Sequence, residues 1–199
     1  MTFNPIESNT FEKEQINVGQ ANENDADGIL DVQKERILSE TKDIEGLSKK
    51  GFLIYPISKS DIIDAVSNPK DSFIFVAKDK AGVVIGYFLA YDFLHYLEKY
   101  PDWKSDVGNF SSNFEESETV YGKHVATRKG VSGVGTAIDK YSFNQLRERG
   151  YKHFIAEICE GPIENSRSSN FHSSKFDLNR IGGYKDKNKY DWGIYLKQL

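Results

Sequence analysis

Apolar residues along the chain form short runs typical of strands and spaced positions typical of helices. DSFIFVAKDK (71–80) and VVIGYFLAYD (83–92) are rich in β-branched and aromatic residues and join at Ala81-Gly82, which predicts two paired strands. ETVYGKHVAT (118–127) and YKHFIAEIC (151–159) predict two more strands. Between these last two, apolar residues recur at helical spacing at Val134, Ala137, Ile138, Tyr141 and Leu146.

The remaining segments complete a mixed pattern. They predict a strand within 12–21, helices within 22–43, 57–67 and 164–176, a loop between Gly46 and Gly51, and a closing hairpin over 180–199. The order is a strand, helices, a β meander and then β-α-β-α-β-β, which predicts an α/β (α+β) fold rather than alternating βαβ units. We expect a flexible tail over residues 1–10 and a single domain over 11–199.

The composition favours a soluble globular protein. The 199 residues suffice for one domain with a sizeable core, and the net charge of −4 gives no reason to expect a nucleic-acid partner. Cys159 is the only cysteine, which excludes a disulfide framework and a thiolate zinc cluster, and we expect no metal site. No apolar run approaches the ~20 residues of a membrane span, so we expect a cytoplasmic protein without a membrane partner.

Three glycines crowd the segment HVATRKGVSGVGTAIDKY (124–141), between a predicted strand and a predicted helix. A Walker loop would need a lysine after Gly135, where Thr136 stands. A dinucleotide fingerprint that starts at Gly133 would need a third glycine at Ile138. Both interpretations fail. The segment is then either a strand–turn–helix whose backbone N–H groups converge on an anion, or an ordinary glycine-rich turn.

This segment resembles the acyl-CoA pyrophosphate loop of the GNAT superfamily of N-acetyltransferases, whose motif is [QR]-x-x-G-x-[GA]. Gly133 and Gly135 occupy the glycine positions, whereas Gly130 stands where the family has Gln or Arg. AEICEGPIENSRSSNFH (156–172) resembles the next strand and helix of the family. Its matching positions are Asn165, Ser168, Phe171 and His172. The chain is therefore identified as a divergent member of this superfamily.

The resemblance implies an acetyl-CoA site between two central parallel strands that splay apart. Pantetheine would bond to strand backbone like an added strand. Asn165 would bond the pantetheine arm, and it is also a good helix N-cap. The loop would cradle the pyrophosphate, with Arg128 as a nearby cation. The implied cofactor-binding residues are Val125, Thr127, Arg128, Gly130, Val131, Gly133, Val134, Gly135, Thr136 and Asn165.

Acetyl transfer to an amine needs a proton donor for the departing thiolate and a base for the ammonium group. By resemblance, His172 stands where many relatives carry a tyrosine that acts as general acid. A backbone-bonded, partly buried histidine is the structural alternative. Tyr121 and Tyr184 are the weaker candidates for the same role.

Glu118 and Glu157 are the candidate bases, and a water relay is the alternative. Glu157 interrupts the apolar run FIAEIC, where a charge needs a partner or a slot. A strict two-residue period puts Tyr121, Lys123 and Val125 on one strand face, opposite Glu118. Glu157 is therefore the preferred base. Cys159 is expected to be a small core residue rather than a nucleophile.

The long connection 93–118 combines aromatic and acidic side chains, and in the family this region borders the acceptor site. Its members are His95, Tyr96, Tyr100, Trp103, Phe110, Phe114, Glu115, Glu116 and Glu118. An aromatic and acidic lining would suit a cationic amine. A capping subdomain or a homodimer surface is the alternative.

The resemblance thus implies an acetyl-CoA-dependent N-acetyltransferase. It would transfer an acetyl group to a primary amine, on a small molecule or a peptide, by direct attack in a ternary complex. Gly130 and the absent tyrosine leave two alternatives, namely a catalytically silent acyl-CoA-binding module and a CoA-free interaction domain.

Overall fold

The fold is that of a computed structural model, which describes residues 16–38, 44–103 and 108–199. Its strands are β1 (Asn17–Gln20), β2 (Ser72–Lys78), β3 (Val84–Asp92), β4 (Thr119–Thr127), β5 (His153–Gly161), β6 (Asn179–Lys185) and β7 (Asp191–Gln198). Its α-helices include α1 (Ala26–Lys34), α2 (Ile44–Lys50), α3 (Lys59–Ser67), α4 (Phe93–Lys99), α6 (Val134–Glu148) and α7 (Ser166–Phe176). The tail predicted over residues 1–10 lies outside the described ranges.

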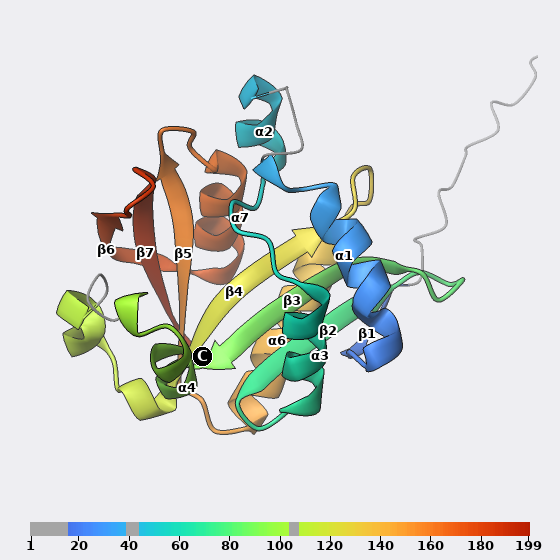
Figure 1. The fold of residues 1–199 in the computed structure, drawn as a ribbon, viewed down its shortest axis with the longest axis horizontal. Helices are drawn as coiled ribbons and strands as arrows, with labels where there is room; N and C mark the ends of the chain where they lie inside the picture. Colours follow the sequence, from blue (N-terminus) through green and yellow to red (C-terminus); the bar gives the residue numbers. More distant parts are fainter. Residues whose placement is uncertain (1–15, 39–43, 104–107) are drawn as a thin grey trace, which may run out of the picture.

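The strands form one seven-stranded sheet in the order β1-β2-β3-β4-β5-β7-β6 (Figure 1). Neighbouring strands run antiparallel throughout, except that β4 and β5 run parallel. A parallel pair needs a long crossover, and α6 supplies it. The sheet is therefore mixed and mostly antiparallel, and it confirms the predicted α+β fold.

Helices cover both faces of the sheet. Ile29 and Val32 of α1 and Ile62 of α3 are fully buried in the core on one face. Ile138 and Leu146 of α6 are fully buried in the core on the opposite face. In the described part of the chain, no helix has both the length and the apolarity to cross a membrane.

The two parallel strands separate along their length, as the resemblance implied. Residues 119–122 of β4 pair with residues 153–156 of β5. Beyond this ladder β4 continues beside β3 and β5 continues beside β7 (Figure 1). The sheet therefore opens on the side of the carboxyl ends of β4 and β5.

A β-bulge interrupts β4 at the point where the strands separate. Leu89 of β3 pairs with His124, whereas the next residue, Ala90, pairs with Gly122. Lys123 is therefore an extra residue in β4, and a bulge of this kind changes the direction of the side chains that follow it.

The bulge changes which residues of β4 share a face. Tyr121 and Ala126 pack in the core cluster beneath α1, whereas Val120 and Val125 pack in the cluster beneath α6. Before Lys123 the odd-numbered residue Tyr121 faces α1, and after it the even-numbered residue Ala126 does. The strict two-residue period, which put Tyr121, Lys123 and Val125 on one face, is wrong for this strand.

Two connections also differ from the prediction. Residues 46–50 belong to α2 rather than to a loop, and Gly51, with φ 77, follows the end of that helix. The connection 93–118 begins with α4 and ends with the short 3₁₀ helices η3 (Gly108–Asn113) and η4 (Glu116–Glu118). Asp92 caps α4, because its side chain accepts a hydrogen bond from the backbone N–H of His95 at 3.0 Å.

Candidate active site

The opening between β4 and β5 contains two adjoining cavities. We call the larger, of about 730 Å³, the main cavity and the smaller, of about 270 Å³, the loop cavity. The residues that line both are Phe52, Leu53, Val125, Asn165, Ser168 and His172. Segments from β4, α7 and the chain after α2 therefore meet where the two cavities join.

The loop cavity lies against the glycine-rich turn and the first turn of α6. Its wall includes Val131, Gly133, Gly135 and Thr136. Gly133 is the N-cap of α6, has φ 78 and brings no side chain to cap the helix. The first N–H groups of a helix have no partner within the helix. The turn therefore offers backbone donors to a ligand in this cavity.

Cationic side chains surround the same cavity. Arg36, Lys50 and Arg167 contribute to its wall. Arg36 also holds the end of β4, because its Nε donates to the carbonyl oxygen of Thr127 at 2.7 Å. The pattern along the chain gave no signal for these residues, since they come from the turn after α1, from α2 and from α7 rather than from the loop.

Three residues of the implied cofactor site lie outside the walls of both cavities, namely Arg128, Gly130 and Val134. The Nη1 of Arg128 lies 3.0 Å from a carboxylate oxygen of Glu35, and its Nε donates to the carbonyl oxygen of Val84 at 2.9 Å. The side chain of Val134 is buried in the core. The structure thus directs the Arg128 guanidinium toward α1 rather than toward the loop cavity.

Asn165 stands at the start of α7 with both ends of its amide engaged. Its Oδ1 accepts from the backbone N–H of Ser168 at 3.4 Å, and its Nδ2 donates to the carbonyl oxygen of Phe52 at 2.9 Å. The helix-capping interpretation is therefore confirmed. Val125 and Thr127 also lie at the loop cavity. Contact of these residues with pantetheine stays a prediction.

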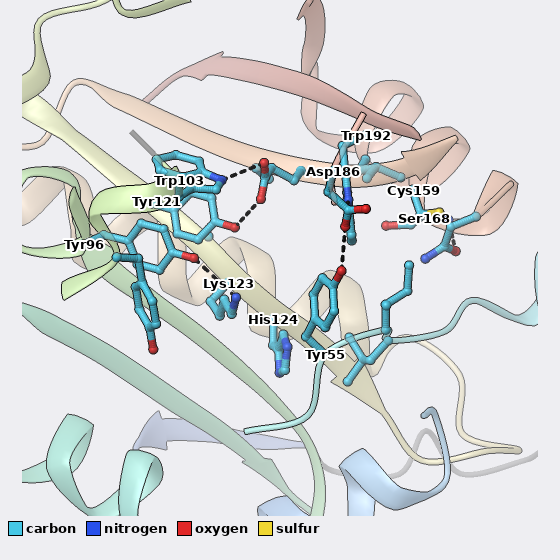
Figure 2. Close-up of a pocket in the computed structure, with 18 of the residues that line it drawn as sticks. Tyr55, Tyr96, Trp103, Tyr121, Lys123, His124, Cys159, Ser168, Asp186 and Trp192 are labelled. Atoms are coloured by element: carbon cyan, nitrogen blue, oxygen red, sulfur yellow. Dashed lines mark hydrogen bonds between the residues drawn. The ribbon is translucent and has the colours of Figure 1, made fainter. Parts of the chain in front are cut away.

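Glu157 of β5 lies in the wall of the main cavity and accepts three hydrogen bonds. Its Oε1 accepts from Trp103 Nε1 at 2.8 Å and from the Tyr184 hydroxyl at 2.5 Å. Its Oε2 accepts from the Tyr121 hydroxyl at 2.6 Å (Figure 2). Burial raises the pKa of Glu157, and the three donors and Lys123 act in the opposite direction. The carboxyl that the sequence singled out is thus brought together with both candidate tyrosines.

The other two candidates from the sequence have ordinary structural roles. Glu118 lies outside both cavities and forms an ion pair with Lys152 at 2.5 Å. The buried Cys159 lies 3.3 Å from the carbonyl oxygens of Gly161 and Ile163, and burial raises the pKa of its thiol to about 11. A thiol with this pKa is a poor nucleophile at neutral pH.

His172 is bound on both ring nitrogens. Its Nδ1 lies 2.9 Å from the carbonyl oxygen of Ser168 and 3.2 Å from the Ser168 hydroxyl. Its Nε2 lies 3.5 Å from Oδ2 of Asp139, a fully buried carboxyl on α6 whose pKa is raised by burial. A carbonyl oxygen can only accept, so Nδ1 carries a hydrogen, and Nε2 faces the carboxyl of Asp139.

The bulge in β4 places two consecutive side chains, Lys123 and His124, in the wall of the main cavity (Figure 2). His124 Nδ1 lies 3.1 Å from the hydroxyl of Tyr87 beneath the cavity. Neither residue was among the predicted site residues. The available signal was a charged residue in the middle of a predicted strand, which resembles the signal that identified Glu157.

We expect His124 to make folding less stable in acid. Burial lowers the pKa of His124 from 6.5 to about 3, so the imidazole stays neutral in the folded chain. The unfolded chain protonates this histidine more readily than the folded chain does. The stability of the folded chain is therefore unaffected by the protonation of His124 above about pH 6.5, and it decreases as the pH falls from there toward about 3. The free energy of unfolding should fall by up to ~1.4 kcal/mol per pH unit from this residue. Urea unfolding across this range should show a shallower slope for His124→Gln, and equal slopes would contradict the assignment.

The connection 93–118 contributes aromatic residues and Asp102 to the wall of the main cavity. Its aromatic members there are Tyr96, Tyr100 and Trp103. The acidic residues that the sequence singled out, Glu115, Glu116 and Glu118, do not line the cavity. Tyr96 stacks on Tyr121 at a centroid distance of 4.0 Å, and Trp103 meets the same ring at 4.7 Å. The lining is therefore aromatic and acidic, but its carboxylates include those of Asp102 and of Glu157 on β5 rather than those of the three glutamates.

Comparison with solved structures shows which known fold this is. A ribosomal-protein-alanine N-acetyltransferase from Brucella melitensis aligns with a TM-score of 0.63 and 18% identity, over 92% of this chain and 99% of that one. A GCN5-related N-acetyltransferase from Kribbella flavida aligns with a TM-score of 0.60 and 14% identity, over 92% and 98%. The chain has the GNAT fold. A putative acetyltransferase from Salmonella typhimurium, solved with its cofactor acetyl-CoA, aligns with a TM-score of 0.62 and 16% identity, over 93% and 94%.

No protein-family model matches the sequence, and no curated protein matches it. This chain thus shares the GNAT fold with proteins whose sequences are only 14–18% identical to it. The short motifs around Gly133 and Asn165 remain recognisable because they lie on the βα turn and the helix start that border the slot.

Proposed function

We propose that this chain is an acetyl-CoA-dependent N-acetyltransferase that acts on a primary amine by direct attack in a ternary complex. One observation carries the proposal: the cavities between β4 and β5 adjoin, and they link the glycine-rich start of α6 to the half-buried carboxyl of Glu157. The similarity in fold to acetyltransferases, one of them with acetyl-CoA, supports the same function.

The loop cavity fits the phosphate end of acetyl-CoA. A Cβ on Gly133 would enter open space, so the glycine leaves room for a ligand beside the backbone. The N–H groups of the first turn of α6 would hold the pyrophosphate, together with Arg36, Lys50 and Arg167 in the wall. The edge of β4 beyond residue 122 would take the pantetheine amides. When bound, acetyl-CoA supplies an acetyl group activated as a thioester.

Glu157 would remove a proton from the acceptor ammonium. A carboxylate has about four acceptor positions, and the donors from Trp103, Tyr184 and Tyr121 occupy three of them. The remaining position is on Oε2, and an amine in the main cavity would occupy it. Burial strengthens the base by raising the pKa of Glu157, while the three donors hold it in one orientation.

Ser168 rather than His172 would donate a proton to the departing thiolate. Both ring nitrogens of His172 already face protein groups, whereas the Ser168 side chain lies where the two cavities join. The serine Oγ–H would go to sulfur, and His172 Nδ1–H would replace it. A proton on the Asp139 carboxyl, whose pKa is raised by burial, would then pass to His172 Nε2 and restore the neutral imidazole, and solvent would later return one proton to the pair. His172 and Asp139 are positioning residues in this scheme.

We expect Ser168→Ala to lower kcat about 10- to 100-fold while the Kd for acetyl-CoA stays unchanged, because the thiolate would lose its donor. Asp139→Asn should lower kcat to a similar extent and change the pH profile of kcat, since the proton-holding pair is lost. Steady-state kinetics and calorimetry measure both effects. Ser169→Ala is the matched control, because its hydroxyl bonds the carbonyl oxygen of Ser166 outside both cavities. An unchanged pH profile in Asp139→Asn would exclude the relay.

Thiol release from acetyl-CoA tests the function itself. The panel contains simple amines, polyamines, amino acids and peptides with free N-termini, and we expect release that depends on the amine. If acetyl-CoA binds and no amine elicits release, the chain is a silent acyl-CoA-binding module instead. If acetyl-CoA does not bind, both interpretations are wrong.

A further inference from the structure

Lys123 of β4 is a half-buried lysine in the wall of the main cavity. The bulge places it beside Tyr96 of α4 and Tyr100 at the end of that helix. Its Nζ lies 3.3 Å from the Tyr96 hydroxyl and 5.7 Å from the ring centroids of both Tyr96 and Tyr100 (Figure 2). Within residues 16–38, 44–103 and 108–199, no carboxylate forms an ion pair with it.

A second ammonium group lies beside the same ring. Lys99 Nζ is 5.7 Å from the centroid of Tyr100, and Lys99 also lines the main cavity. Lys99 lies 3.9 Å from Asp61, whose other oxygen already accepts from the backbone and hydroxyl of Ser58. Two ammonium groups, those of Lys99 and Lys123, therefore lie beside the ring of Tyr100. The carboxylate that pairs with Lys99, that of Asp61, also belongs to the capping box of α3.

Glu157 does not satisfy Lys123 directly. Its oxygens accept from Trp103, Tyr184 and Tyr121, and its effect on Lys123 is electrostatic at longer range. Asp61 also acts on Lys123 at longer range. An ammonium group that is partly removed from water gains from a direct anionic partner. The wall of the main cavity thus contains, among its charged residues, a cation without an ion pair in the described residues and, on β5, an anion with one acceptor position left.

This pairing matches a ligand that carries one charge of each sign. A zwitterion would place its ammonium group at Glu157 and its carboxylate at Lys123. An amine without an acid group would leave the Lys123 ammonium without a direct anionic partner. The aromatic residues Tyr96, Tyr100 and Trp103 would then enclose the apolar part of the ligand.

We propose that Lys123, assisted by Lys99, binds the carboxylate of the acceptor, so that the acceptor is an amino acid or another primary amine with a carboxylate. This inference rests on the proposed transferase function and adds the chemical class of the acceptor. Glu157 selects the amine, and Lys123 selects the acid group.

Matched pairs of acceptors test the inference: phenylalanine with phenethylamine, lysine with cadaverine, and 4-aminobutyrate with butylamine. The wild-type chain should use the acid-bearing member of at least one pair with a kcat/KM at least ~10-fold higher than that of its partner. Lys123→Met should raise the KM for that acid at least ~10-fold without raising the KM of the plain amine or the Kd for acetyl-CoA, because only the acid has a carboxylate for Lys123 to bind. Lys140→Met, on the exposed side of α6, is the control and should behave as wild type.

Calorimetric titration of the preferred acid into the CoA-loaded protein separates this inference from the transferase proposal. Binding that Lys123→Met abolishes, without thiol release, would keep the carboxylate site and reject the transfer chemistry. Equal use of acids and amines, or an acid preference that persists in Lys123→Met, would overturn the inference while the transferase proposal stands. Mass spectrometry that finds an acetyl group on Lys123 itself would also overturn it, since Lys123 would then be an acceptor.

Discussion

Replacing Glu157 with glutamine should lower kcat at least ~100-fold, because a neutral amide cannot take the proton of the acceptor ammonium. The substitution keeps the size of the side chain but turns one oxygen into an NH₂ group. In either orientation of the amide, the NH₂ group would face at least one hydrogen-bond donor. Trp103 and Tyr184 donate to one oxygen of Glu157, and Tyr121 donates to the other. Initial rates of thiol release at saturating acetyl-CoA measure the effect.

The matched control for this variant is Glu160→Gln on the same strand. Glu160 forms a surface pair with Arg180, with Oε1 2.7 Å from the arginine Nε. We expect Glu160→Gln to leave kcat unchanged, and both variants to bind acetyl-CoA as wild type does. If Glu157→Gln keeps the wild-type kcat, a water relay rather than this carboxylate removes the proton.

Replacing Gly133 with valine should abolish acetyl-CoA binding. Gly133 has φ 78, a conformation that a β-branched residue adopts only at a cost of order 1–3 kcal/mol. The side chain of the valine would also occupy the open space beside the first turn of α6, where the pyrophosphate is proposed to lie. Calorimetry with acetyl-CoA measures the loss of affinity.

Gly82→Val is the control that distinguishes the effect of backbone strain from the effect of blocking the loop cavity. Gly82 has φ 82 and an equally open surrounding, and it lies in the turn between β2 and β3, outside both cavities. Both variants should lose similar thermal stability, and only Gly133→Val should lose acetyl-CoA affinity. Equal affinity in the two variants would mean that the loop is not the phosphate site.

The sequence predicts most of the fold because its elements have strong local signals. β2 and β3 are short apolar runs joined by a glycine turn, and α6 shows helical spacing between a glycine start and a glycine stop. Glu157 could be found for a similar reason, since a carboxylate in a buried strand departs from its surroundings.

Other parts of the site depend on contacts between distant segments. The bulge at Lys123 is set by the register of β4 against β3, and a period counted along one strand cannot detect it. Arg128 is the nearest cation to the loop along the chain, yet Glu35 of the distant α1 region binds it. Asp139 is one polar residue of an amphipathic helix in the sequence, and only the packing of α7 on α6 places it beside His172.

Titration of the wild-type chain with acetyl-CoA in a calorimeter shows whether the slot between β4 and β5 is an acetyl-CoA site. We expect one site per chain with a Kd of about 1–100 μM. We also expect this binding to be lost in Gly133→Val and kept in Glu157→Gln. No heat of binding up to high micromolar acetyl-CoA would mean that the slot is not an acetyl-CoA site.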